Sequence, residues 1–256
     1  MDAEGVATVT TQAELIGDDE LGYLRSRTAF VAGAGMALDD GYRLAHLPLI
    51  DPHHPKAIAR KDGTHYENGR HPPIYSLVVP TLDLPEASAY RELERELRQA
   101  PFAAKIAWDL VAQRQAKLHA TVCGSLSVGA PPTIDQAARD ALSRLGPVEM
   151  ELRGLFSGNV NRGRLYLRLY PERRDGQNAF HLIQRALGRS TSDLYVVGIW
   201  NLNEDLDAAE AVALAAMLDR WWDRPILRFT ADQLWLMGAS DDLVLDSKIV
   251  ETISLK

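Results

Sequence analysis

The segment KLHATVCGSL, residues 117–126, places a histidine and a threonine two positions apart in an apolar run. Side chains alternate between the two faces of a strand, so His119 and Thr121 project from one face with Cα atoms about 7 Å apart. An imidazole can exchange a proton near neutral pH, and a threonine hydroxyl can donate a hydrogen bond to a phosphoryl oxygen. The spacing therefore predicts a strand whose His119 and Thr121 side chains bind one phosphate group together. An ordinary strand with a satisfied histidine is the structural alternative.

The only cysteine of the chain, Cys123, falls on the same predicted face as His119. Four positions along a strand correspond to about 13 Å, which is too far for the imidazole to activate a thiolate directly. Cys123 is therefore interpreted as a small apolar filler. The opposite face of the strand, formed by Leu118, Ala120 and Val122, is expected to enter the core.

The elements around this strand follow a recurring order. Apolar alternation and helical spacing predict strands and helices in the order strand, helix, strand, helix, strand, and this order then appears a second time. The expected ranges of the first set are 74–80, 87–100, 117–126, 131–146 and 148–158, and those of the second set are 164–171, 177–189, 193–202, 207–222, 226–238 and 248–255. Within the helix at 131–146, Thr133 is the expected N-cap and Gly146 the expected stop. We expect an α+β, two-lobed, pseudo-duplicated fold with antiparallel central sheets flanking a cleft and helices outside.

Two segments precede the regular part of the chain. Residues 1–45 show no clean period and are assigned to an N-terminal extension. Residues 46–75 hold five of the seven histidines among prolines and glycines, which favours a long polar loop or flap. The bilobal domain is expected at 76–256, with lobe one at about 76–157 and lobe two at about 158–256.

This organisation resembles the 2H phosphoesterase superfamily, whose members carry one H-x-[ST]-hydrophobic motif in each of two lobes. His119-Ala120-Thr121-Val122 matches the first motif, and the preceding FAAKIAWDLVAQRQAKLHATV and the C-terminal LWLMGASDDLVLDSKIVETISL are similar to family segments. The resemblance covers roughly residues 75–256. It implies a metal-independent phosphodiesterase of the cyclic phosphodiesterase type, a hydrolase in which paired histidines act as general acid and base and no cofactor is required.

The second motif departs from the family pattern. It should lie in LYVVGIWNL, where one register places Val196 and Gly198 at the histidine and threonine positions. A shift by two residues places Gly198 and Trp200 there, and neither register restores a histidine. His181 lies in a predicted helix, where an amphipathic role is expected.

Three interpretations of a site that has only the first of the two motifs stay open. In the first, the flap GTHYENGRH completes the site, with His65 or His71 as the missing acid and Tyr66 and Arg70 beside the phosphate. In the second, the protein binds a nucleotide or phosphate without turnover, with space at Gly198 and a base stacked on Trp200. In the third, the fold serves protein interaction, for which the adjacent Trp221 and Trp222 are candidates, and a protein partner is possible.

Composition narrows the class of ligand. The chain has 256 residues and a formal net charge of −7. This charge disfavours binding along a long nucleic acid but is compatible with a compact anion bound in a pocket. One cysteine excludes an intrachain disulfide framework and a cysteine-based zinc site. The start of the chain lacks a secretory signal pattern, and no apolar run approaches a membrane span, so no membrane partner and a cytoplasmic location are expected.

The sequence therefore predicts a 2H phosphoesterase-like protein acting on a nucleotide-like phosphodiester or cyclic phosphate. The expected partner is a small phosphate-containing ligand, such as a cyclic nucleotide or a short RNA end. The expected catalytic residues are His119 and Thr121. The alternative is a catalytically degenerate protein that binds nucleotide, phosphate or another protein.

Overall fold

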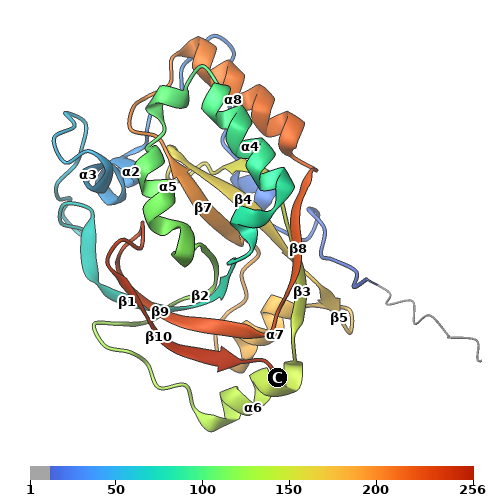
Figure 1. The fold of residues 1–256 in the computed structure, drawn as a ribbon. Coiled ribbons are helices and arrows are strands. Elements are labelled where there is room, and N and C mark those ends of the chain that lie inside the picture. The colour runs from blue at the N-terminus through green and yellow to red at the C-terminus, as the bar shows by residue number, and fades with distance from the viewer. Residues whose placement is uncertain (1–11) are drawn as a thin grey trace, which may run out of the picture.

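A computed structural model describes residues 12–256 of the chain. Its centre is one curled, antiparallel, eight-stranded sheet in the order β10-β9-β1-β2-β7-β4-β3-β8, which confirms the predicted α+β class (Figure 1). The strands of this sheet are β1 (Arg70–Pro80), β2 (His119–Val128), β3 (Val148–Ser157), β4 (Arg164–Pro171), β7 (Val196–Asn201), β8 (Pro225–Ala231), β9 (Gln233–Asp241) and β10 (Ser247–Ser254).

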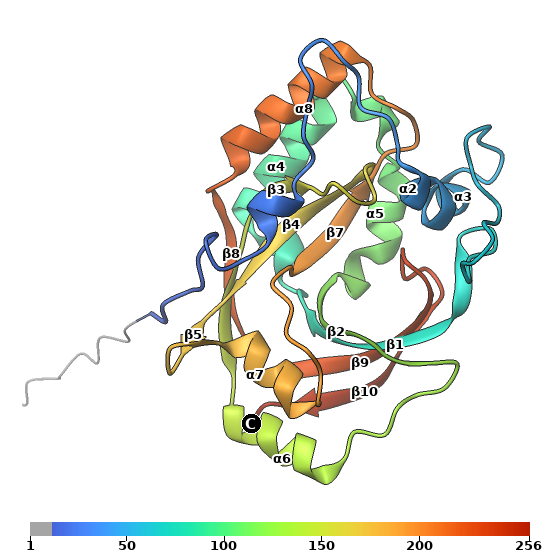
Figure 2. The same cartoon turned by 180° about the vertical axis from the view of Figure 1, so that it is seen from behind.

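Helices cover the outside of the sheet. Two of them, α4 (Ser88–Gln99) and α8 (Ala208–Trp221), lie side by side against the half that contains β3 and β8 (Figures 1 and 2). The pair α6 (Gln136–Leu145) and α7 (Ala179–Ala186) lies against the other half, where α7 contacts β2 and α6 contacts β10. Between them, α5 (Trp108–Arg114) contacts β7 at the middle of the sheet.

The helix ends follow local capping chemistry. The Asp207 side chain accepts from the backbone N–H of Glu210, whose side chain accepts in return from Asp207, so a capping box starts α8. In α6 the N-cap is Asp135 rather than the predicted Thr133, because the Asp135 carboxylate accepts from the N–H of Ala138. Gly146 ends α6 with φ +74, a left-handed conformation that favours glycine, as predicted.

The pairing of the strands differs from the two predicted lobes. β3, assigned to the first lobe, pairs with β4 and β8, whereas β9 and β10, assigned to the second, lie beside β1. The connection between β3 and β4 is short, so these neighbours form a hairpin and the boundary at 157/158 runs through it. Each half of the sheet therefore contains strands from both predicted lobes.

The segment before the first strand is also different from the prediction. Residues 12–45, which include α1 (Tyr23–Ser26) and α2 (Asp40–Ala45), join the core instead of forming a separate extension, while residues 1–11 lie outside the described residues. The Tyr23 hydroxyl donates to the Leu169 carbonyl at 2.6 Å and lies 2.8 Å from the Tyr195 carbonyl. Buried donors need such partners, and these contacts fix the segment to β4 and to the entry of β7.

The predicted flap at 46–75 is shorter than expected. It begins with a helical turn, α3 (Leu47–Ile50), and its last residues already belong to β1, which starts at Arg70. Pairing of Arg70 with Asp241 of β9 extends the strand past two prolines, at a point where the ladder is irregular. Turns fill the residues between these elements.

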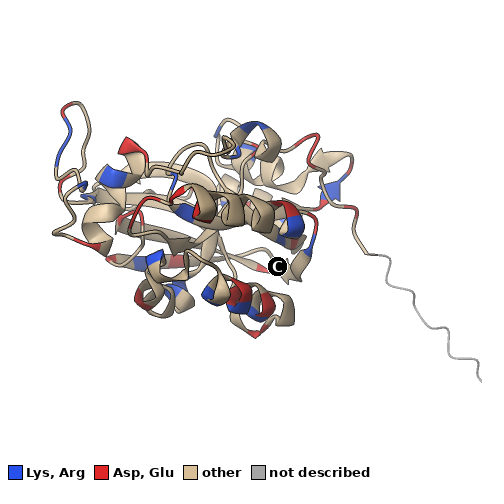
Figure 3. Ribbon diagram, turned by 90° about the horizontal axis from the view of Figure 1, so that it is seen from above, with Lys and Arg blue, Asp and Glu red and all other residues tan. Residues whose placement is uncertain are grey.

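Two further findings describe the exterior. No helix in the part of the chain that the structure describes has the length and apolar content needed to cross a bilayer. Acidic and basic residues are interspersed along the helices and loops seen in Figure 3.

Candidate functional site

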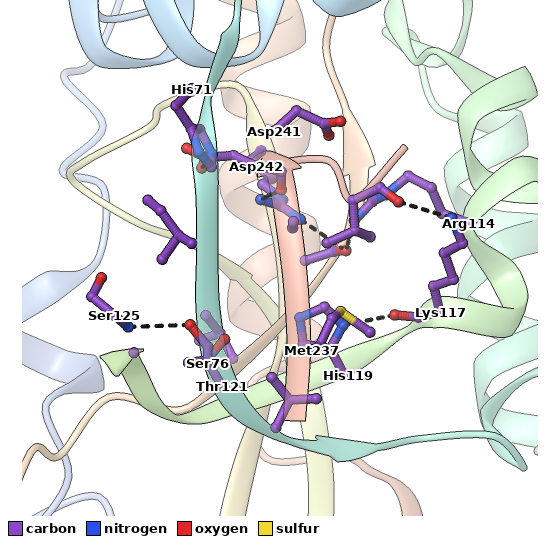
Figure 4. Close-up of a pocket in the computed structure, with 18 of the residues that line it drawn as sticks. His71, Ser76, Arg114, Lys117, His119, Thr121, Ser125, Met237, Asp241 and Asp242 are labelled. Carbon is purple, nitrogen blue, oxygen red and sulfur yellow. Dashed lines mark hydrogen bonds and ion pairs between the residues drawn. The ribbon is translucent and has the colours of Figure 1, made fainter. Parts of the chain in front are cut away.

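A cavity of about 470 Å³ lies against the middle of the sheet, where both predicted motif strands contribute to its wall. The motif strand β2 contributes His119 and Thr121, and β7 contributes Val196 and Gly198. The other polar residues around it are His65, Tyr66, His71, Ser76, Arg114, Lys117, Ser125, Arg164, Tyr166, Asp241 and Asp242, of which several are labelled in Figure 4. The structure thus brings together residues from the flap, from β1 and from both sides of the strand pair β2–β7.

His119 is held with one ring nitrogen free. Its Nδ1 lies 2.7 Å from the carbonyl oxygen of Lys117, and a carbonyl only accepts, so Nδ1 carries the proton (Figure 4). Nε2 then has its lone pair available and forms no hydrogen bond with the described residues. The ring keeps some surface open to the cavity, but the protein packed around it makes a charge costly. This burial, together with the nearby Arg164 and Arg114 guanidiniums, lowers the pKa of His119 to about 4.

The predicted alternation of β2 holds for His119 and Thr121 and then changes. Both side chains reach the cavity, and Thr121 is exposed there, while Ala120 is buried on the other face. A register shift between Leu77 and Val78 of β1 marks a β-bulge next to Cys123. A bulge reverses which face the following residue occupies, so Cys123 is buried in the core, as the filler interpretation predicts. Burial raises the pKa of its thiol to about 12.

The second strand brings Gly198 beside His119. Ala120 pairs with Val197 in antiparallel register, which places Gly198 next to His119. A Cβ atom at Gly198 would lie 2.6 Å from Nη2 of Arg164, so the absence of a side chain makes room for this guanidinium. Arg164 therefore occupies the place where the second motif would present a side chain.

Trp200 does not reach the cavity. The indole is fully buried in the core and stacks on Tyr90 of α4, with ring centroids 5.7 Å apart and planes 17° apart. β4 is offset against β7 between Leu165 and Tyr166, next to this position. The buried indole therefore has no open face for the predicted stacked base.

Two arginines form the cationic part of the cavity. Arg114 is buried and donates to the carbonyl oxygens of Leu243, Ile199 and Gly198 at 2.6, 3.0 and 2.7 Å. Burial, with the charge of Arg164 nearby, lowers the pKa of Arg114 to about 9, so it stays protonated at neutral pH.

Arg164 is held in a similar way. It donates through Nη1 to the carbonyl oxygen of Asp242 at 2.9 Å and lies 3.2 Å from Nε2 of His46, while Nη2 is 3.4 Å from the carbonyl oxygen of Gly198. Within residues 12–256, the hydrogen-bond acceptors of both guanidiniums are neutral groups rather than carboxylates. Neither guanidinium therefore has a carboxylate in direct contact, although the Asp241 and Asp242 carboxylates line the same cavity and Asp242 interacts with the charge of Arg164.

The flap contributes fewer residues to the cavity than predicted. His65, Tyr66 and His71 line the cavity, but Arg70 does not, since its side chain is exposed and pairs with Asp246 at 3.4 Å. Tyr66 donates to the Asp242 carboxylate at 2.8 Å, and the His65 ring stacks on that of Tyr66 with centroids 4.8 Å apart. These contacts attach the flap to the tip of the β9–β10 hairpin.

His71 is placed to hold Asp242 rather than to protonate a ligand. Its Nδ1 lies 2.8 Å from the Pro72 carbonyl, and its Nε2 lies 3.3 Å from a carboxylate oxygen of Asp242. Burial opposes the charge on the ring, but Asp242 and the Pro72 carbonyl outweigh it and raise the pKa of His71. Burial also opposes the charge of Asp242, but the contact with His71 and the hydrogen bond from Tyr66 nevertheless hold the pKa of Asp242 well below its usual range. Both ring nitrogens of His71 lie next to protein acceptors, which leaves neither directed at a ligand as the predicted acid would require.

The remaining histidines lie elsewhere. His54 pairs with Glu204 at 3.2 Å, and His181 pairs with Asp193 at 2.9 Å on α7, as the helical interpretation expects. Within the described residues, no group of three or more His, Cys, Asp or Glu side chains is arranged to hold a metal ion.

Sequence reasoning missed Arg114, Arg164, Asp242 and His46. Arg164 is the first residue of the strand expected at 164–171, and no motif marks it in the sequence. Arg114, Asp242 and His46 come from a helix, a hairpin tip and the start of the predicted flap, and no spacing in the chain connects them. Neither a protein-family model nor a curated protein sequence matches this chain.

Proposed function

We propose that the cavity binds a nucleotide-like phosphodiester or cyclic phosphate, and that His119 acts on it as a metal-independent acid/base catalyst of the 2H phosphoesterase type. One observation carries the proposal. His119, neutral and with a free Nε2, lies in the same cavity as Thr121 and beside the Arg164 guanidinium, which has no carboxylate partner among the described residues. A base, a hydroxyl donor and a cation are the groups that phosphate ester hydrolysis needs.

The order of the strands supports the same proposal. β1 and β2 are followed outward by β9 and β10 on one side, and β4 and β7 by β3 and β8 on the other. The strands expected at 74–80 and 164–171, and those expected at 117–126 and 193–202, hold the same places in the two predicted sets. They take corresponding places on the two sides of the β2–β7 contact. This arrangement is the one expected if the two strands descend from equivalent motifs.

The chemistry assigned to each group is simple. A water molecule forms the new bond to phosphorus while His119 Nε2 takes its proton, and the bond from phosphorus to one ribose oxygen breaks. The released oxygen keeps the electron pair and then gains a proton from His119 or from solvent. Thr121 donates to a phosphoryl oxygen, and Arg164 with Arg114 stabilises the developing negative charge.

The direct experiment measures hydrolysis of 2′,3′-cyclic nucleotides in the presence of a chelator. His119→Ala should lower turnover by at least about 100-fold, the lower range for a lost acid/base group. His53→Ala is the matched control, because His53 is an exposed histidine in a turn outside the cavity. Equal turnover by the wild type and the His119 variant would overturn the catalytic assignment.

A second candidate function is binding without turnover. The observation that favours it is the replacement of the second motif by Gly198 and Arg164, since an arginine cannot release its proton at neutral pH. A nucleotide that binds with Arg164-dependent affinity but is not hydrolysed would identify this function. The adjacent tryptophans were the sequence feature behind the protein-interaction alternative, and both make contacts within the chain. Trp221 is buried, and Trp222 packs against Arg168 with the guanidinium carbon 3.6 Å from the ring centroid.

A further inference from the structure

His46, from the segment outside the family resemblance, lies directly behind Arg164. It is fully buried and stacks on Tyr42, with ring centroids 4.9 Å apart and planes 10° apart. The Tyr42 hydroxyl donates to the Leu202 carbonyl at 2.6 Å, which fixes the stack against the end of β7. The imidazole is therefore positioned by packing on one side and by Arg164 on the other.

The contact between His46 and Arg164 defines the state of the ring. A guanidinium only donates hydrogen bonds, so Nε2 of His46, 3.2 Å from Nη1, must be the acceptor, and the proton of the neutral ring is on Nδ1. Burial, reinforced by the charge of Arg164, lowers the pKa of His46 to about 3, so the ring is neutral over the physiological range.

A neutral partner is unusual for a partly buried arginine. Carboxylates are the common partners, and they cancel the charge of the guanidinium while they orient it. An imidazole acceptor orients the guanidinium without placing a negative charge in contact with it. The other acceptors of Arg164, the carbonyl oxygens of Asp242 and Gly198, are neutral in the same way.

We propose that His46 is a positioning residue that orients Arg164 without adding a negative charge beside it, so that the cavity selects an anionic, phosphate-like group at that position. The inference rests on the proposed function and adds to it a specific role for the start of the predicted flap. It identifies the charge of Arg164, and not only its hydrogen bonds, as the determinant of affinity.

Titration calorimetry with inorganic phosphate on the full chain tests this role. His46→Gln places a neutral acceptor near the Nε2 position, and its phosphate affinity should stay within about threefold of the wild type. His46→Glu supplies an acceptor that is charged, and affinity should fall by about tenfold or more because the carboxylate neutralises Arg164. His53→Glu adds the same charge at an exposed turn and should leave affinity unchanged.

The outcomes separate the two proposals. If His46→Glu binds phosphate as tightly as the wild type does, the role of His46 is overturned and the proposed function stands. Absence of phosphate and cyclic-nucleotide binding in the wild type overturns the proposed function itself. If circular dichroism shows that His46→Glu is unfolded, the pair His46→Gln and His46→Leu decides, since only the leucine removes the acceptor. Equal affinity in that pair would again overturn the inference.

Discussion

The guanidinium of Arg164 fills the space that a side chain at Gly198 would need, since a Cβ atom there would lie 2.6 Å from Nη2. The two residues come from adjacent strands, β4 and β7, and the same contact places Arg164 beside His119 of β2. A cation thus stands where the predicted second motif would place a side chain. The cavity consequently holds His119 next to two arginines, with Asp241 and Asp242 also in its lining.

Gly198→Ala should displace Arg164. The added methyl group overlaps the guanidinium, so we expect phosphate affinity to fall by about tenfold and the free energy of unfolding to fall by about 1–3 kcal/mol. Gly124→Ala is the control for stability, because a Cβ at Gly124 would meet only the Thr121 methyl group at 3.7 Å. Calorimetry and chemical denaturation measure both quantities. An affinity unchanged in Gly198→Ala would show that Arg164 does not contact the ligand.

Arg114 should matter for the fold as well as for the site. It is buried, and Arg114→Leu leaves the carbonyl oxygens of Leu243, Ile199 and Gly198 without their donors. We expect the free energy of unfolding to fall by about 3 kcal/mol or more. Arg25→Leu removes an exposed arginine whose pair with Asp193 has N···O 3.5 Å, and should cost at most about 1 kcal/mol. Comparable losses in the two variants would contradict the structural role.

Acid should destabilise the protein through His46 and His119. Their folded-state pKa values, about 3 and about 4, lie below the ordinary value of 6.5, so the unfolded chain binds more protons in between. The free energy of unfolding should therefore fall as the pH drops below 6.5, by about 1 kcal/mol per pH unit for each histidine. Between pH 6.5 and about 4.5, the free energy of unfolding of His46→Gln and of His119→Gln should each change less steeply with pH than that of the wild type. Equal slopes in a variant and the wild type would refute the lowered pKa of the histidine that the variant lacks.

His71 should act in the opposite direction at higher pH. Its pKa is raised in the folded state, so its stabilising contribution is complete below about 6.5 and is lost as the pH rises through the folded-state value. Asp242→Asn removes the carboxylate that holds the imidazolium, and should flatten this alkaline decline. Denaturation between pH 6 and 9 measures the slope. A variant that declines as steeply as the wild type would exclude the His71–Asp242 pair as its source.

Periodicity in the sequence was sufficient to predict most of the strands and helices. Most strands and helices from residue 74 onward, the α+β class and the face shared by His119 and Thr121 follow from patterns that depend on local burial. The helix α5 was not among the expected elements. The bulge near Cys123 could not be predicted, because it depends on pairing with β1 across a long sequence separation. The same limit explains Trp200, whose burial depends on Tyr90 of a helix far away in the chain.

The site was less predictable than the fold. His119 and Thr121 carry a local motif, but Arg164 is recognisable only once Gly198 is known to lie beneath it. His71 has the residue type of an acid, yet its contacts with Asp242 and Pro72 occupy both ring nitrogens. Residue type and spacing identify candidates, whereas the direction of each polar atom depends on the tertiary structure.

The central claim is that an anionic phosphate binds beside Nε2 of His119, and the most direct measurement is the NMR titration of that imidazole with and without phosphate. In the free protein its pKa should be near 4. A bound phosphate anion favours the imidazolium, so saturating phosphate should raise the pKa of His119. A His119 titration curve that phosphate leaves in place would contradict the account.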